Sequence, residues 1–283
     1  MRLASFNVLH GRSVEDQRVD PERLRAAVRH LDADVLCLQE VDYQQARSHY
    51  SDMTRVAAEA MDASAWRFQP TLLGVPGGAW RRPGGGDITT GTDGDTVGFP
   101  APVESAYGIS LISRHPVVQW RGVAFSAAPM RSPVLMPGTS RPMLLVDEPR
   151  AGVAAVLDTP EGTLTVVCTH LSFVPGWNAR QLRQLTAAVA DLPEPLILLG
   201  DLNLPGAVPR LITGWQQLAR VATYPAWQPR VQLDHAMARG DGFTPAAVQA
   251  VRLPLSDHCA LVIDTPIPAP GRYAPSLRRR MGR

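Results

Sequence analysis

The chain has 283 residues, of which 45% are hydrophobic, and its formal net charge is +2. This length and composition suit one large or two small globular domains with a sizeable core, and exclude an intrinsically disordered or fibrous chain. The charge balance does not exclude an anionic partner, because a local patch can be basic while the total is nearly neutral.

The three cysteines, Cys37, Cys168 and Cys259, each lie in an apolar run, and their spacing matches no zinc pattern. They are best interpreted as buried, reduced thiols, which favours a cytoplasmic protein. The chain starts without the apolar segment of a signal peptide, and no stretch approaches the length of a membrane span. We therefore expect a cytoplasmic protein without a transmembrane segment, acting as a monomer.

The first sixty residues alternate strands with helices. Asp20 followed by Pro21 is a helix start, because aspartate caps a helix and proline suits its first position. Leucine, alanine and valine then recur at helical spacing as far as Leu31. The elements expected here are strands over 2–8 and 34–38, the second ending in Gln39-Glu40, and helices over 21–31 and 51–61.

Residues 74–105 are dense in glycine and proline and lack apolar periodicity, so we expect one long loop there. Its carboxylates do not have the spacing of an EF-hand calcium loop. The loop is either a disordered insertion, which we favour, or a substrate-facing segment. A strand is expected over 107–113, and a second proline-rich loop over 126–141.

The rest of the chain is rich in short apolar runs. A helix is expected from about Asn178, with Leu182 and Leu185 facing inward. Residues 266–283 are rich in proline and arginine and are expected to form a disordered tail after a single domain over 1–265. The expected strands are 143–146, 153–157, 164–168, 196–199, 232–237 and 259–263.

Polar side chains recur where these strands end. Gly200-Asp-Leu-Asn203 directly follows the apolar run 195–199, and residues two apart in an extended chain point the same way. Asn7, Glu40 and His170 also end strands, whereas Tyr107 and Asp257-His258 precede theirs. If all of these groups meet at one edge, the last strand and the Tyr107 strand must run opposite to the others, which predicts mixed sheets.

Taken singly, each of these residues has a simpler interpretation. One aspartate or histidine at a strand end is usually a turn former or a cap, and a lone tyrosine is usually core. We assign a structural role to the histidines outside the pattern, which are His10, His30, His49, His115 and His235. The coincidence at five separate strands is what favours a functional site.

The ordered set of short motifs resembles the endonuclease/exonuclease/phosphatase superfamily. The resemblance implies an α/β (α+β) four-layer sandwich, in which two mixed, largely antiparallel sheets pack face to face with helices outside. The matching segments are Ser5-Phe-Asn7, Leu38-Gln-Glu40, Tyr107-Gly with Ser113-Arg114, Ser140-Arg-Pro142, Thr169-His-Leu171, Gly200-Asp-Leu-Asn203, Leu233-Asp-His235 and Ser256-Asp-His258.

The resemblance also implies a role for each residue. Glu40 would bind a divalent cation together with Asn7 and Asp257, and oxygen ligands favour Mg²⁺ or Mn²⁺ over zinc. Asp201 would orient or deprotonate the attacking water. Asn203 would bind the phosphate or the nucleophile, and His170 would contact the phosphate or the leaving oxygen. His258, held by Asp234, would donate a hydrogen bond to the charge that develops on the phosphoryl group. Tyr107 would form a hydrogen bond near the phosphate.

The implied activity is metal-dependent hydrolysis of a phosphodiester or phosphomonoester. His170 argues against dedicated abasic-site repair, because enzymes of that class typically lack a histidine there. Gly108-Ile109 departs from the Gly-Asn of many relatives, which places one polar contact in doubt. The partner stays open between nucleic acid, a phospholipid headgroup and an inositol phosphate. The alternative function is a non-catalytic phosphate-binding module on the same fold. A zinc hydrolase is disfavoured, because the chain contains no HExxH motif or comparable cluster.

Overall fold

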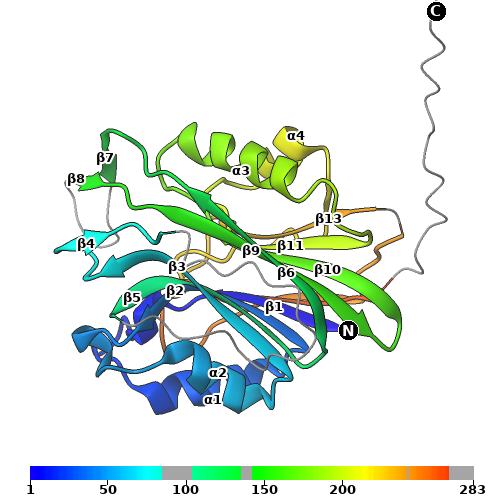
Figure 1. The fold of residues 1–283 in the computed structure, drawn as a ribbon, viewed down its shortest axis with the longest axis horizontal. Helices are drawn as coiled ribbons and strands as arrows, with labels where there is room; N and C mark the ends of the chain where they lie inside the picture. Colours follow the sequence, from blue (N-terminus) through cyan, green and yellow to red (C-terminus); the bar gives the residue numbers. More distant parts are fainter. Residues whose placement is uncertain (85–103, 135–141, 241, 268–283) are drawn as a thin grey trace, which may run out of the picture.

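The computed structural model describes residues 1–84, 104–134, 142–240 and 242–267. Two β-sheets pack face to face, and helices cover their outer surfaces (Figure 1). The seven-stranded sheet has the order β14-β15-β1-β2-β5-β3-β4 and the six-stranded sheet the order β12-β13-β11-β10-β9-β6. The described residues therefore confirm the predicted four-layer sandwich.

The strands of the seven-stranded sheet are β1 (Arg2–Asn7), β2 (Val35–Tyr43), β3 (Ala65–Gly74), β4 (Trp80–Arg81), β5 (Ala106–Ser113), β14 (Ala247–Val251) and β15 (Ala260–Asp264). Those of the six-stranded sheet are β6 (Val117–Phe125), β9 (Arg150–Thr159), β10 (Gly162–His170), β11 (Leu196–Asp201), β12 (Gln216–Gln217) and β13 (Asp234–Arg239). A separate two-stranded ribbon pairs β7 (Arg131–Val134) with β8 (Met143–Val146).

The central core lies between the two sheets. Its members alternate along the strands, as expected when successive side chains point to opposite faces. Leu3, Val35 and Cys37 face it from one sheet, and Val166 and Leu199 from the other, all of them fully buried. The residues between them face the helices, so strands buried on both faces read as continuous apolar runs.

Helices α1 (Pro21–Leu31) and α2 (Met53–Met61) pack on the outer face of the seven-stranded sheet, and α3 (Trp177–Ala188) with α4 (Val208–Thr213) on that of the six-stranded sheet (Figure 1). The cap predicted at Asp20 is present, since its carboxylate accepts the Glu22 backbone N–H. Two short 3₁₀ helices, η1 (Leu9–Gly11) and η2 (Ala46–Ser48), follow β1 and β2.

The strand directions agree with the mixed sheets that the positions of the polar residues predict. β1 runs parallel to β2, whereas β15 is antiparallel to β1 and β5 is antiparallel to β2. In the other sheet β10 runs parallel to β11, and β13 is antiparallel to β11. The carboxyl ends of β1, β2, β10 and β11 and the start of β13 are thus available to form one polar edge.

Two strand ends differ from the sequence prediction. Glu40 does not end β2; it lies inside that strand at an irregularity in the pairing with β5 between Leu38 and Val41, and its φ is 58°. Such a bulge re-aims one side chain without ending the strand. Tyr107 does not precede its strand but is the second residue of β5.

Several strands carried too weak a pattern to be predicted. β3 contains Pro70 at a pairing irregularity, and β6 is an edge strand whose apolar run is interrupted by Gln119 and Arg121. β14, β12 and the short helix α4 were also missed. The expected loop over 74–105 includes the end of β3 and all of β4, and the loop over 126–141 includes β7.

Three expectations concern residues outside the described ranges. These are the conformation of most of the glycine-rich loop (85–103), the Ser140-Arg141 part of one motif, and the tail over 268–283. The three cysteines are free and buried, as expected. Within the described residues, none of the helices combines the length and the apolar character needed to cross a bilayer.

Candidate active site

One polar edge gathers residues from both sheets. The side-chain amide of Asn7, at the end of β1, donates to Glu40 Oε1 at 3.0 Å and to Asp201 Oδ2 at 3.1 Å. Asn7 therefore joins a carboxylate of the seven-stranded sheet to one of the six-stranded sheet. Its amide oxygen accepts the Leu9 N–H at 3.1 Å, which fixes which end of the amide faces the carboxylates.

The position before Asp201 in the chain requires glycine. Gly200 has a φ of 154°, and a Cβ there would lie 2.0 Å from the carbonyl oxygen of Thr169 on the neighbouring strand. The close approach holds β10 and β11 together at their ends, where His170 and Asp201 are partners in the pairing register. Asn203 follows with a left-handed φ of 50°, a conformation that asparagine tolerates better than most residues.

Asp201 lies between two imidazoles. Its Oδ2 is 3.6 Å from His170 Nε2 and 3.8 Å from His258 Nε2, and its Oδ1 accepts the backbone N–H of Asn203 at 2.9 Å. Burial raises the pKa of Asp201 to about 7, although the His258 cation opposes the rise. A carboxyl group with this pKa can accept a proton near neutral pH and release it again.

His258 is held in its charged form. Its Nδ1 donates to Asp234 Oδ2 at 2.8 Å, and the ring of Tyr224 packs 4.8 Å away. Burial by itself lowers the pKa of His258, but the carboxylates of Asp234 and Asp201 outweigh burial and raise it to about 10. The imidazolium thus carries a proton on Nε2 that faces Asp201.

His170 is held neutral by a residue that the sequence prediction missed. Arg150, buried at the start of β9, places Nη1 3.1 Å from His170 Nδ1. Burial and the Arg150 charge lower the pKa of His170 well below its usual value. Arg150 follows Pro149 and precedes an apolar strand, so the rule that picked out Tyr107 and Asp257-His258 could have found it.

Asn203 and Tyr107 complete the edge. The Asn203 amide donates to the Leu171 carbonyl at 3.0 Å and lies 3.4 Å from His170 Nε2. Tyr107 is buried, and the guanidinium of Arg47 lies 5.4 Å from its ring centre. Burial, assisted by the charge of Glu40, raises the pKa of Tyr107 well above its usual value, so its hydroxyl stays a hydrogen-bond donor.

Glu40 and Asp257 have the chemistry of a site for a hard cation. Burial raises the pKa of Glu40, and the nearby charge of Asp257 raises it further, so an added positive charge between them would be stabilised. Carboxylate oxygens are the ligands that Mg²⁺ and Mn²⁺ prefer. Asn7 presents its amide nitrogen to Glu40. It would serve as an oxygen ligand only after its side-chain amide flipped.

A second cluster also has ligand geometry. Asp201, Asp234 and His258 offer atoms within 4.8 Å of one another. Because Asp234 Oδ2 already accepts the His258 Nδ1 proton, we interpret Asp234 and His258 as a hydrogen-bonded charge pair. Glu40 with Asp257 is the better candidate for a cation.

Solved structures share this fold at low sequence identity. An endonuclease/exonuclease/phosphatase from Beutenbergia cavernae matches with a TM-score of 0.62 and 21% identity, over 94% of this chain and 71% of that one. The mannosyl-6-phosphatase of Bacteroides thetaiotaomicron matches at 0.58 and 12%, over 94% and 100%. The human Nocturnin catalytic domain with bound sulfate matches at 0.56 and 16%, over 95% and 94%.

No curated protein sequence matches the chain. The sequence profile of the Endonuclease/Exonuclease/phosphatase family, in contrast, matches residues 4–258, a span that includes every residue of the polar edge. With the two mixed sheets, this match confirms the predicted resemblance: the chain belongs to the endonuclease/exonuclease/phosphatase family.

Proposed function

We propose that this protein is a divalent-metal-dependent phosphoesterase that hydrolyses its substrate with an activated water. The observation that carries the proposal is the environment of Asp201, a carboxyl group with a pKa of about 7 placed between one charged and one neutral imidazole. Family membership supports a phosphoester hydrolase in general. The role of each predicted site residue is the one that the family resemblance implies, and the contacts in this chain support it.

Glu40 and Asp257, with Asn7 beside them, would hold Mg²⁺ or Mn²⁺. When bound, such an ion polarises a phosphoryl oxygen and stabilises the charge on the leaving oxygen. Asn7 also positions the carboxylates, because it donates to Glu40 and Asp201 at once.

Asp201 is the group that takes a proton from water. Its Oδ1 accepts the Asn203 N–H, and its Oδ2, which also accepts the Asn7 amide, faces both imidazoles and would orient and deprotonate the nucleophile. Its elevated pKa matches the proton affinity that a base needs near neutral pH. Asn203, half-buried next to His170, would bind the phosphate or the nucleophile through its amide.

The cationic side of the site would stabilise charge on the phosphoryl group. His258 donates from Nε2, and Asp234 keeps it protonated and oriented. Arg150 adds a permanent positive charge beside His170, which contacts the phosphate or the leaving oxygen. The protonated hydroxyl of Tyr107 would donate a further hydrogen bond.

The substrate class stays broad at this level: a phosphodiester or phosphomonoester of nucleic acid, of a phospholipid headgroup or of an inositol phosphate. The mannosyl-6-phosphatase and the sulfate-bound Nocturnin domain, which share the fold, are compatible with a small phosphoester or another tetrahedral anion. The buried reduced cysteines favour action in the cytoplasm, and we expect a monomer.

Metal-titrated hydrolysis of bis-p-nitrophenyl phosphate tests the proposal. Activity should need Mg²⁺ or Mn²⁺ and fall roughly 10²–10⁴-fold in Asp201→Asn and His258→Ala. His30→Ala, which changes an exposed histidine on α1, is the matched control. Phosphate binding without turnover would favour the non-catalytic module, and activity that survives both site variants would overturn the assignment. Supercoiled DNA, RNA, sphingomyelin and inositol phosphates assayed in parallel would then identify the substrate class.

A further inference from the structure

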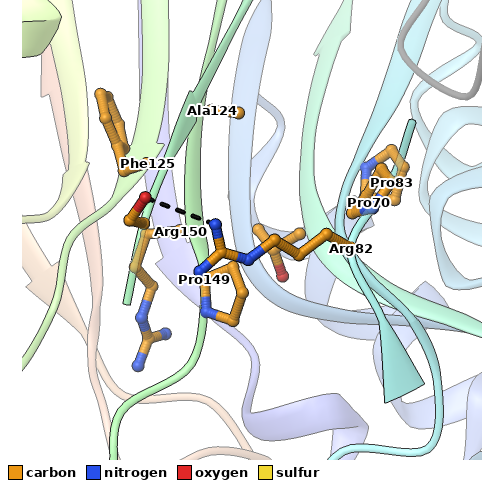
Figure 2. Close-up of a pocket in the computed structure, with 9 residues that line it drawn as sticks. Pro70, Arg82, Pro83, Ala124, Phe125, Pro149 and Arg150 are labelled. Atoms are coloured by element: carbon orange, nitrogen blue, oxygen red, sulfur yellow. Dashed lines mark hydrogen bonds between the residues drawn. The ribbon is translucent and has the colours of Figure 1, made fainter. Parts of the chain in front are cut away.

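Arg150 is a buried cation whose guanidinium reaches the candidate active site. The residue pairs with Phe125 of β6 and is 7% exposed, and its guanidinium is turned away from Arg82 (Figure 2). Its Nη1 lies 3.1 Å from His170 Nδ1. A buried cation is costly unless an opposite charge lies nearby, so the groups behind the guanidinium decide whether it can stay at this place.

Asp147 supplies the opposite charge. This aspartate directly follows β8 and is 1% exposed, and its Oδ1 lies 3.7 Å from Arg150 Nη2. Of the described residues, only Asp147 brings a carboxylate oxygen within 4.0 Å of this guanidinium. Burial lowers the pKa of Arg150, but Tyr107, Asp147 and Glu148 outweigh burial and raise it above its usual value.

The carboxylate of Asp147 is itself fixed by two hydrogen bonds. Its Oδ2 accepts the backbone N–H of Ala128 at 2.8 Å and the hydroxyl of Ser172 at 2.7 Å. Ser172 in turn donates its backbone N–H to Gln181 Oε1 of α3 at 2.7 Å, and both of these side chains are buried. The Oδ1 atom is therefore a fixed point of negative charge that faces Arg150.

The ion pair leaves the hydrogen-bond donors of Arg150 free for the site. At 3.7 Å, the contact between Oδ1 and Nη2 is longer than a hydrogen bond. Asp147 Oδ1 and Arg150 Nε are both buried, and neither has a hydrogen-bond partner among the described residues. A close bidentate pair would occupy two N–H groups and draw the guanidinium towards Asp147. The longer contact attracts the guanidinium and leaves Nη1 beside His170.

We propose that Asp147 is a positioning residue for phosphate binding, which holds the Arg150 guanidinium beside His170 through this ion pair. Asp147 then stands behind Arg150 as Asp234 stands behind His258, so that each cation of the site has its own buried carboxylate. The inference rests on the proposed phosphoesterase function, because the phosphate that Arg150 binds is the reacting one.

Binding of inorganic phosphate to the metal-free protein tests the ion pair without turnover. NMR titration, followed through the His170 signals, gives Kd for wild type, Asp147→Asn, Arg150→Gln and the double variant. Asp147→Asn should weaken Kd about 10-fold, and the double variant should bind no more weakly than Arg150→Gln, because Asp147 acts through Arg150. With bis-p-nitrophenyl phosphate, Asp147→Asn should raise KM by a similar factor with kcat nearly unchanged, as expected for lost binding.

Asp264→Asn is the matched control, because Asp264 also pairs with an arginine, Arg2 at 3.0 Å, at the opposite end of β1 from Asn7. If Asp147→Asn leaves the phosphate Kd within twofold of wild type, or weakens it equally with and without Arg150, the positioning role is wrong even when bis-p-nitrophenyl phosphate is hydrolysed. The non-additive pattern without any hydrolysis would instead support the ion pair and overturn the proposed phosphoesterase.

A measurement on the wild-type protein covers the case in which Asp147→Asn does not fold. A guanidinium held on both sides rotates slowly, so side-chain nitrogen NMR should show separate Nη signals for Arg150. One averaged signal, as from an exposed arginine, would mean that Asp147 does not hold it.

Discussion

Two buried histidines lie at nearly the same distance from the same carboxylate oxygen, and the protein keeps one of them neutral and the other positively charged. His170 and His258 are 3.6 and 3.8 Å from Asp201 Oδ2, with exposures of 4% and 5%. Burial lowers the pKa of both imidazoles. The difference comes from the far side of each ring, where Arg150 contacts His170 Nδ1 and Asp234 contacts His258 Nδ1.

The comparison teaches that residue type and burial do not fix the charge of a site histidine. The surrounding charges decide it. For His258 the carboxylates of Asp234 and Asp201 together outweigh the desolvation of the imidazole, whereas for His170 the Arg150 charge adds to desolvation. The two histidines divide the site into a His258 half, in which His258 can donate a proton, and a His170 half, in which Arg150 is the hydrogen-bond donor. The following experiments change one half at a time.

Asp234→Asn should have the largest effect, because it makes His258 resemble His170. Without the Asp234 charge, the pKa of His258 falls from about 10, and the orientation of its ring is weakened. Phosphoesterase activity should drop roughly 10²–10⁴-fold. NMR titration of His258 in metal-free protein measures the pKa directly, with Asp158→Asn, an exposed carboxylate on β9, as control. An unchanged pKa would contradict the division of the site.

Glu40→Gln tests whether this carboxylate belongs to the cation site. Removing this charge should raise the Mg²⁺ concentration for half-maximal activity by about 10–100-fold, as loss of a group that supports a metal typically does. Because burial raises the pKa of Glu40, protons compete with the metal, so wild-type metal affinity should fall as the pH is lowered. Isothermal titration with Mn²⁺ at several pH values checks both effects. Equal metal affinity in variant and wild type would remove Glu40 from the cation site.

Arg150→Gln removes the permanent charge from the His170 half. Its expected effect is about 10–100-fold on kcat/KM, carried mainly by KM, since a charge-assisted contact to the phosphate is lost. The pKa of His170 should rise, because the Arg150 charge, one of the three causes that lower it, is gone. Kinetics and NMR titration of His170 measure the two consequences separately. A loss confined to kcat, with KM unchanged, would argue against phosphate binding by Arg150.

The smallest effect concerns stability against pH in metal-free protein. The pKa of His258 is raised from 6.5 in the unfolded chain to about 10, so its contribution to stability is complete below pH 6.5 and is lost as the pH rises towards 10. Thermal unfolding should show Tm decreasing across this window in wild type and less steeply in Asp234→Asn. For a chain of this size, each kcal/mol lost lowers Tm by roughly 2–4 °C. Identical slopes in both proteins would mean that His258 is not charged in the folded state.

The sequence carried the information for much of the fold. Apolar runs such as 196–199, buried on both faces, predict strands by themselves, and Asp20-Pro21 predicts a helix start, because these signals depend on neighbours in the chain. Strands whose residues face solvent or contain proline, such as β6 and β3, have no such local signal. Their pairing with β9 and β5 places them in the sheets.

The same division holds for the candidate site. The sequence by itself predicted that Asn7, His170 and Asp201 end their strands, and the positions of the polar residues predicted mixed sheets. Only the tertiary structure placed Arg150 beside His170 and put Glu40 in a bulge inside β2. The charges of the two histidines belong to this second class, because a pKa depends on burial and on charges brought close by folding, and neither can be read from positions along the chain.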